Sequence, residues 1–192
     1  MPDPADLLRD AIDESAAILE ACRSLATPLA DWCRLCGEVW DGGGKLLVCG
    51  NGGSAADAMH LAEELIARFQ AERKALAAIA LLDPTTLTCA ANDFGFDHIF
   101  SRQVEALGRP GDVLVAISTS GNSANIINAV AAAEAAGVRT VALLGKGGGK
   151  LAGRCDVELI APADTSHRVQ EVHELLFHTF CEWADGYALG EG

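Results

Sequence analysis

Apolar residues recur every three or four positions over residues 5–40, which is the spacing of amphipathic helices. Leu8, Ile12, Leu19 and Cys22 share one face in that pattern. A break into two helices is predicted at Thr27-Pro28, because a proline disfavours helical backbone at the residue before it. Glycines then end the pattern at residues 42–44. We therefore expect a helical N-terminal segment over residues 1–41.

Five short apolar runs follow, and they lack the polar alternation of half-exposed strands. Such runs are typical of strands that are buried on both faces of a sheet. Helical patterns separate them, which indicates a parallel sheet with crossover helices. We predict an α/β fold: a doubly wound, five-stranded parallel sheet flanked by helices, with an N-terminal helical extension. Strands are expected at residues 45–49, 77–82, 113–117, 140–144 and 157–160, and helices at 54–69, 84–107 (two short ones), 124–136 and 167–184.

The composition fits one domain over residues 1–192, with 50% hydrophobic and 21% charged residues. The formal net charge is −13 at pH 7. A surface this negative disfavours nucleic acid and anionic membranes as partners. A phosphorylated small molecule remains possible, because a few local donors can outweigh a distant field that salt screens. We expect a small-molecule substrate, no nucleic acid and no membrane.

The seven cysteines and the N-terminal sequence indicate the cellular compartment of the protein. No apolar run approaches the ~20 residues that a membrane-spanning helix needs. No basic segment followed by an apolar stretch precedes residue 20, so no secretory signal is visible. We expect a cytoplasmic protein with reduced thiols. Cys33 and Cys36 form a lone CxxC without the second pair that a structural zinc site needs, and we interpret them as buried thiols.

Two loops of small residues, at 50–54 and 118–123, each follow a predicted strand and precede a predicted helix. In open α/β sheets, ligands bind beyond the carboxyl ends of the strands. Such a loop exposes backbone N–H groups near the positive end of a helix dipole. Ser118, Thr119, Ser120 and Ser123 add four hydroxyl groups, which suit a phosphate monoester. A polar turn with an N-cap serine would show the same pattern.

Two helices carry groups that could bind a metal. His60 and Glu64 are four residues apart and share one face, and so do Gln170, Glu174 and His178 on the last helix. Imidazole and carboxylate are suitable ligands for zinc or another divalent ion. Taken alone, the first pattern is better explained by a surface hydrogen-bonded pair, and the second by a solvated amphipathic helix. Lys45 and Arg68 are possible phosphate partners or ordinary solvated side chains.

Longer stretches of the sequence match a known family. Residues 49–65 read CGNGGSAADAMHLAEEL, and residues 91–127 read ANDFGFDHIFSRQVEALGRPGDVLVAISTSGNSANII. The match continues through LLGKGGGKLAG at 143–153 and RVQEVHELLFH at 168–178. Together these resemble the bacterial phosphoheptose isomerases of the sugar isomerase (SIS) domain family. The loop at 118–123 alone would indicate only the broad SIS family.

The resemblance implies conversion of sedoheptulose 7-phosphate to D-glycero-D-manno-heptose 7-phosphate, the first step toward the ADP- or GDP-linked heptose of lipopolysaccharide and related glycans. It also implies a homotetramer with active sites at subunit interfaces, and one Zn²⁺ per subunit. The metal ligands would be His60, Glu64, Gln170 and His178. The residues implied to bind substrate are Asn51, Gly52, Gly53, Ser54, Arg68, Asn92, Asp93, Ser118, Thr119, Ser120, Ser123 and Gln170.

Isomerisation requires groups that move protons, and we assign Glu64 as the base and His178 as its partner acid. Two other functions stay open at this point. One is a noncatalytic, regulatory SIS protein, which the presence of both Glu64 and His178 disfavours; the other is an isomerase for a different phosphosugar. The second helical piece carries more apolar surface than one helix needs to cover a sheet, including Trp32, Val39 and Trp40. We therefore expect these residues to contribute to subunit contacts.

Overall fold

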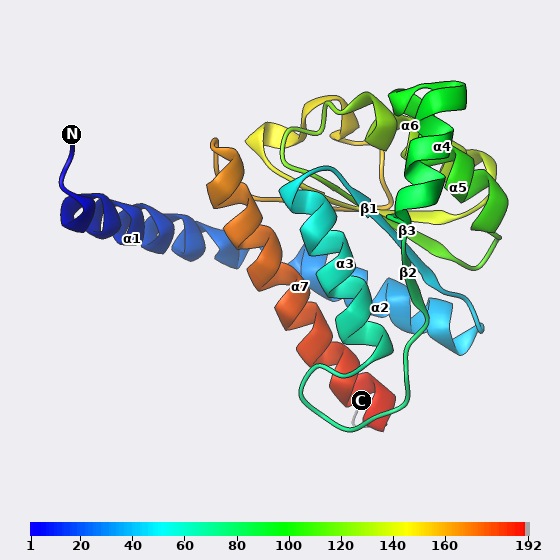
Figure 1. Ribbon diagram of the computed structural model, residues 1–192. Coiled ribbons are helices and arrows are strands. Elements are labelled where there is room, and N and C mark those ends of the chain that lie inside the picture. The colour runs from blue at the N-terminus through cyan, green and yellow to red at the C-terminus, as the bar shows by residue number, and fades with distance from the viewer. Residues whose placement is uncertain (191–192) are drawn as a thin grey trace.

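The computed structural model describes residues 1–190 as an open α/β sheet with helices on both faces (Figure 1). Its five strands are all parallel, in the order β2-β1-β3-β4-β5. This confirms the predicted fold class. No helix in the described part of the chain meets the length and hydropathy that crossing a membrane requires. The strands are β1 (Leu46–Gly50), β2 (Ala78–Ala80), β3 (Val113–Ser118), β4 (Arg139–Leu144) and β5 (Val157–Ile160).

The helices form two layers around this sheet. One apolar core lies between the sheet and α2, α3 and α7, and a second lies between the other face and α4, α5 and α6. Burial of β1 and β3 over their whole length explains their unbroken apolar sequences. The helices are α1 (Pro4–Ala21), α2 (Ala26–Asp41), α3 (Gly53–Ile66), α4 (Pro84–Phe94), α5 (Ser101–Leu107), α6 (Ala124–Ala135) and α7 (Ser166–Leu189).

The N-terminal helices separate earlier than predicted. The break is a 3-10 turn at Cys22–Leu25, not Thr27-Pro28. Pro28 instead lies in the first turn of α2, where its missing N–H leaves no hydrogen bond unmade. Two other boundaries shift as well: α3 ends at Ile66 rather than at residue 69, and α7 continues beyond residue 184 to Leu189.

The prediction that Trp32 and Val39 face another subunit is wrong, because both side chains are buried within the protomer. Trp32 stacks on Phe180 of α7, with 4.1 Å between ring centroids. Trp40 is half-buried in the same cluster. Helix α1 extends away from the sheet and buries none of its residues (Figure 1). Its side-chain hydrogen bonds to α7 are few and polar, such as the ion pair of Glu14 with Arg168 at 2.8 Å.

The described cysteines are all free thiols, and burial raises the pKa of Cys36 well above its ordinary value. Cys33 and Cys36 are both buried in α2, as expected for a structural CxxC. Cys89 lies exposed on α4, and Cys155 is half-buried, whereas the other cysteines are buried. Burial therefore keeps the Cys33 and Cys36 thiols protonated, which does not favour metal binding or redox chemistry at this pair.

Candidate functional site

The first loop of small residues (the glycine loop, residues 50–54) joins β1 to α3. Gly50 has no room for a Cβ, which would collide with the backbone of Ser54. Gly52 has a φ of 58°, a left-handed conformation that favours glycine. Ser54 is buried in the first turn of α3. The loop therefore turns the backbone tightly enough to start α3 at the carboxyl end of β1.

The second loop (the serine loop, residues 118–123) follows β3, which pairs with β1, so the two loops lie at the same edge of the sheet. Two of its hydroxyls fix the turn: Ser118 Oγ accepts from the Gly121 N–H at 3.1 Å, and Ser120 Oγ from the Asn122 N–H at 3.2 Å. Ser123 precedes α6, but its side chain makes no capping hydrogen bond. Its hydroxyl and the amides of Ala124 and Asn125, the first two residues of α6, can therefore bind an anion.

A pair of side-chain amides connects the glycine loop to α6, the helix that follows the serine loop. Asn51 and Asn125 donate to each other's side-chain oxygens, both at 2.8 Å. Asn125 is buried in the first turn of α6. The Asn51 amide, predicted to bind substrate, is therefore engaged in fixing the glycine loop against the start of α6.

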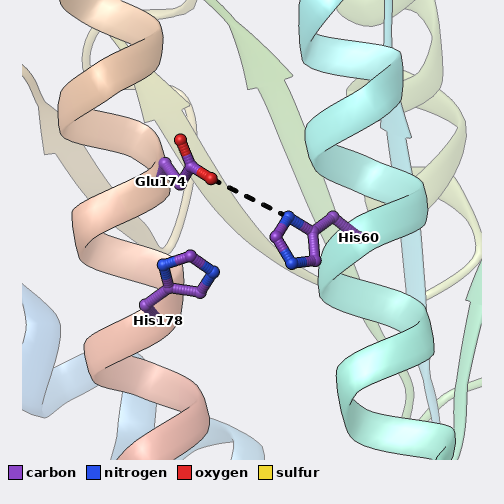
Figure 2. A group of neighbouring side chains, drawn as sticks. All are labelled: His60, Glu174 and His178. Atoms are coloured by element: carbon purple, nitrogen blue, oxygen red, sulfur yellow. Dashed lines mark ion pairs between the residues drawn. The ribbon is translucent and has the colours of Figure 1, made fainter. Parts of the chain in front are cut away.

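The imidazoles of His60 and His178 meet across the α3–α7 interface, with 5.0 Å between ring centroids. Figure 2 shows them pointing toward one another from the two helices, with Glu174 one turn before His178. Glu64 Oε1 lies 3.3 Å from His60 Nε2, and Glu174 Oε1 lies 4.0 Å from His60 Nδ1. Residues more than a hundred positions apart in the sequence thus form one cluster, which neither helix pattern could establish alone.

Gln170 lies at the end of this interface where α3 begins, and its side-chain amide packs against Gly53. A Cβ on Gly53 would occupy the place of that amide. Gln170 is half-buried, one turn before Glu174 on α7. The predicted ligand thus contacts the glycine loop, and a glycine is required at the point of contact.

The donor atoms in this cluster fit a divalent metal ion. Two groups have ligand atoms within 4.8 Å of one another: His60, Glu174 and His178, and His60, Glu63 and Glu64. Imidazole nitrogen together with carboxylate oxygen is a donor set that zinc accepts. Glu174 was among the candidates on this helix face but not in the ligand set that the family resemblance implied.

Asp57, one turn before His60 on α3, is a second acidic group that the sequence reasoning missed. Its Oδ2 atom is buried without a hydrogen-bond partner among the described residues. Burial, helped by the negative charge of Glu174, raises the pKa of Asp57 to about 6, against the effect of His60. The (i, i+3) spacing from His60 was the signal that could have identified it.

Several other predicted residues lie outside this cluster in the protomer. Arg68 is exposed just after α3, and Asn92 and Asp93 are exposed on α4. Asn92 donates to Asp93 at 2.7 Å, and no hydrogen bond or ion pair in the described chain joins these residues to the two loops or the histidines. Lys45 is occupied elsewhere, because its ammonium group pairs with buried Asp112 at 2.6 Å.

Comparison with known proteins gives consistent matches. The SIS domain family model matches residues 12–145. Phosphoheptose isomerases of Fusobacterium nucleatum and Thiobacillus denitrificans are 50% and 51% identical, over 92% and 90% of this chain and 87% and 89% of their own lengths. The solved structure of the phosphoheptose isomerase from Neisseria gonorrhoeae has a TM-score of 0.91 at 43% identity, over 96% of this chain and 100% of that one.

Proposed function

We propose an aldose–ketose isomerisation for this chain, which belongs to the SIS domain family and, within it, to the phosphoheptose isomerases. The substrate is sedoheptulose 7-phosphate and the product is D-glycero-D-manno-heptose 7-phosphate, the first intermediate toward a nucleotide-linked heptose for lipopolysaccharide. The observation that carries the proposal is the cluster of His60, Glu64 and His178 at the α3–α7 interface, below two loops that present anion-binding amides.

The serine loop holds the phosphate group of the substrate in this proposal. Hydroxyl groups and first-turn amides of α6 offer several hydrogen-bond donors without requiring a strongly basic protein. Fixing the phosphate at one end of the sugar orients C1 and C2 at the other end. The protein's net charge of −13 does not oppose this binding when local donors surround the anion.

In this proposal His60, Glu64, Gln170 and His178 would hold Zn²⁺. Glu64 contacts His60, and Glu174 is an added carboxylate whose ligand atom lies within 4.8 Å of those of both histidines. A bound divalent ion would polarise the sugar carbonyl and stabilise negative charge on oxygen. His60 is the residue best placed to join the two helices in this site, because it contacts Glu64 on its own helix and faces His178 on the other.

Glu64 and His178 divide the proton transfers. Glu64 takes a proton from C1 of the ketose, the C–H electrons form the C1–C2 double bond, and His178 gives a proton to the C2 oxygen. Glu64 then returns its proton to C2 while His178 takes the proton of the C1 hydroxyl, which leaves the C1 aldehyde. Both residues end in their starting states, so the cycle needs no further reactant.

We further propose that the protein is a cytoplasmic homotetramer. The apolar face of α1, including Leu8 and Ile12, would be covered by another protomer. Arg68, Asn92 and Asp93 would then contribute to a site in a neighbouring subunit, because they lie apart from the cluster in their own.

A coupled assay with sedoheptulose 7-phosphate, with and without a chelator, tests this function. We expect turnover that the chelator abolishes and added Zn²⁺ restores, with about one zinc per subunit by elemental analysis. Glu64→Gln and His178→Gln should each lose at least ~10²-fold in kcat, whereas Glu182→Gln, an exposed position on α7, should not. Near-normal turnover by either site variant refutes the assigned roles. Binding of the phosphosugar without turnover would indicate a regulatory protein, and turnover of a different phosphosugar would correct the substrate.

A further inference from the structure

Lys146 has a backbone conformation that is unusual for its residue type. Its φ is 51°, and it is the one non-glycine residue with positive φ among residues 1–190. The next three residues, Gly147 to Gly149, share the positive sign and adopt it without steric cost. Strained residues of this kind persist where the surrounding structure fixes them, and they cluster at functional sites.

The segment that contains Lys146 (the second glycine loop, residues 145–149) packs directly against the serine loop. A Cβ on Gly121 would collide with the Gly148 carbonyl, and one on Gly149 would collide with Ser120. Just beyond the loop, the Leu151 N–H donates to the Gly121 carbonyl at 3.2 Å. The loop that carries Lys146 is therefore held against the proposed phosphate-binding loop, while the Lys146 N–H donates to the Ala163 carbonyl at 3.1 Å.

The side chain of Lys146 points to the same place. Its ammonium group donates to Ser166 Oγ at 3.1 Å, and Ser166 Oγ also accepts from Thr119 Oγ1 at 3.3 Å. Ser166 is the first residue of α7, and Thr119 belongs to the serine loop. A cation, two hydroxyl groups and a helix N-terminus thus meet at one point, and all of them favour an anion.

The charge of Lys146 is not used within the described chain. No carboxylate forms an ion pair with it in residues 1–190, whereas Lys45 is paired with Asp112. Lys150, in the same turn, is exposed and contributes its backbone N–H to Asn122 rather than its ammonium group. A phosphate monoester carries about −1.5 to −2 charges at pH 7, as phosphorylated side chains do. Lys146 is therefore the cation that the serine loop has available.

We propose that Lys146 is a substrate-binding residue whose ammonium group pairs with the phosphate group of the sugar, exchanging its hydrogen bond to Ser166 for one to a phosphate oxygen. The proposal rests on the proposed function and deepens it, because it assigns recognition of the phosphate charge to one side chain. Lys146 takes no part in the proton transfers. The alternative is that Lys146 merely ties the second glycine loop to the start of α7.

Three substitutions at one position separate these two roles. Lys146→Met removes the charge and keeps most of the length, and Lys146→Arg keeps the charge. Lys146→Gly removes the charge while relieving the strain of the positive φ, so it is expected to fold at least as well as the wild type. Lys150→Met is the matched control in the same turn.

The measurements are the KM and kcat for sedoheptulose 7-phosphate, and the dissociation constant of inorganic phosphate by calorimetry. We expect Lys146→Met and Lys146→Gly to raise both KM and the phosphate dissociation constant at least 10-fold, with kcat within about 2-fold of wild type. Lys146→Arg should recover most of this loss and Lys150→Met should show none. Urea denaturation of each variant checks the fold.

Phosphate binding unchanged in Lys146→Gly would overturn the proposal, and so would an equal loss in Lys146→Arg and Lys146→Met. The calorimetric arm does not depend on turnover. An inactive wild type that still binds phosphate through Lys146 would therefore refute the proposed reaction while supporting the role of Lys146.

Discussion

Acid should destabilise this protein through one buried histidine, His173. The side chain is fully buried in α7, and its Nε2 lies 3.0 Å from the Leu144 carbonyl, to which it donates. Its Nδ1 has no partner among the described residues. Burial lowers the pKa of His173 to about 4 from 6.5, although the bond to Leu144 acts in the opposite direction. The folded protein therefore holds this imidazole neutral.

The sign of the effect follows from that lowered pKa. Between pH 6.5 and pH 4 the unfolded chain binds a proton at His173 and the folded chain does not, so stability is lost as the pH falls through this window. At one pKa unit per 1.36 kcal/mol, the loss between pH 7.5 and pH 4.5 is about 2.5 kcal/mol. The raised pKa of Asp57 acts with the opposite sign, because the folded state holds that proton more tightly.

Comparison with His173→Gln isolates the histidine, because the Asp57 contribution is common to both proteins. The glutamine amide can still donate to the Leu144 carbonyl. We expect the stability difference between wild type and variant to shrink by about 2.5 kcal/mol from pH 7.5 to pH 4.5. Urea denaturation in the presence of a chelator measures it without a contribution from metal binding. A difference that is the same at both pH values would show that the imidazole is not held neutral in the folded state.

Two further predictions concern stability and assembly. Asp185→Asn should lower the free energy of unfolding by about 3 kcal/mol in urea denaturation, because it leaves buried Arg73, 2.7 Å from that carboxylate, without its charged partner. A loss under about 1 kcal/mol would show that the ion pair does not stabilise the fold in this way. Leu8→Glu with Ile12→Glu should reduce the mass measured by light scattering while the helical circular dichroism persists, whereas Asp10→Ala on the same exposed helix should not. Monomeric wild type would refute the proposed assembly.

The sheet could be predicted from sequence because its strands are continuous apolar runs, a pattern that few other structures share. The helix boundaries were harder to predict from the sequence. Pro28 favoured a break, but a proline in the first turn of a helix costs nothing, so the break formed earlier, at Cys22–Leu25. Trp32 was expected to face another subunit because its partner, Phe180, lies far away in the sequence and only the packing of α2 on α7 brings the rings together.

The candidate site was predicted in its residue types but not in its geometry. His60 and His178 come from helices whose approach depends on tertiary packing, so no spacing rule could show that their rings lie 5.0 Å apart. Glu174 was named as a candidate but not assigned as a ligand, because an acidic residue on an amphipathic helix usually faces solvent, and its side chain is indeed about half exposed here. Asp57 was missed because its burial depends on the same helix contact.

The α3–α7 pair explains how the cluster at its interface can keep its shape. At one end, Gln170 of α7 packs against Gly53 at the start of α3. At the other end, Asp185 of α7 accepts hydrogen bonds from two backbone amides and from Arg73, and Arg73 in turn donates to the Glu64 and Leu65 carbonyls.

This second connection is an ion pair between Asp185 and Arg73, and the Asp185 carboxylate is ionised at neutral pH. Burial opposes the charge on Asp185, but the amides of Ala71 and Gln70 together with Arg73 outweigh it, so the pKa of Asp185 lies below its ordinary value. The histidines therefore lie between two fixed connections on the same pair of helices. Rigid helices hold site residues more precisely than loops do. In the proposed reaction this leaves the loops to bind the phosphate while the helices hold the groups that move protons.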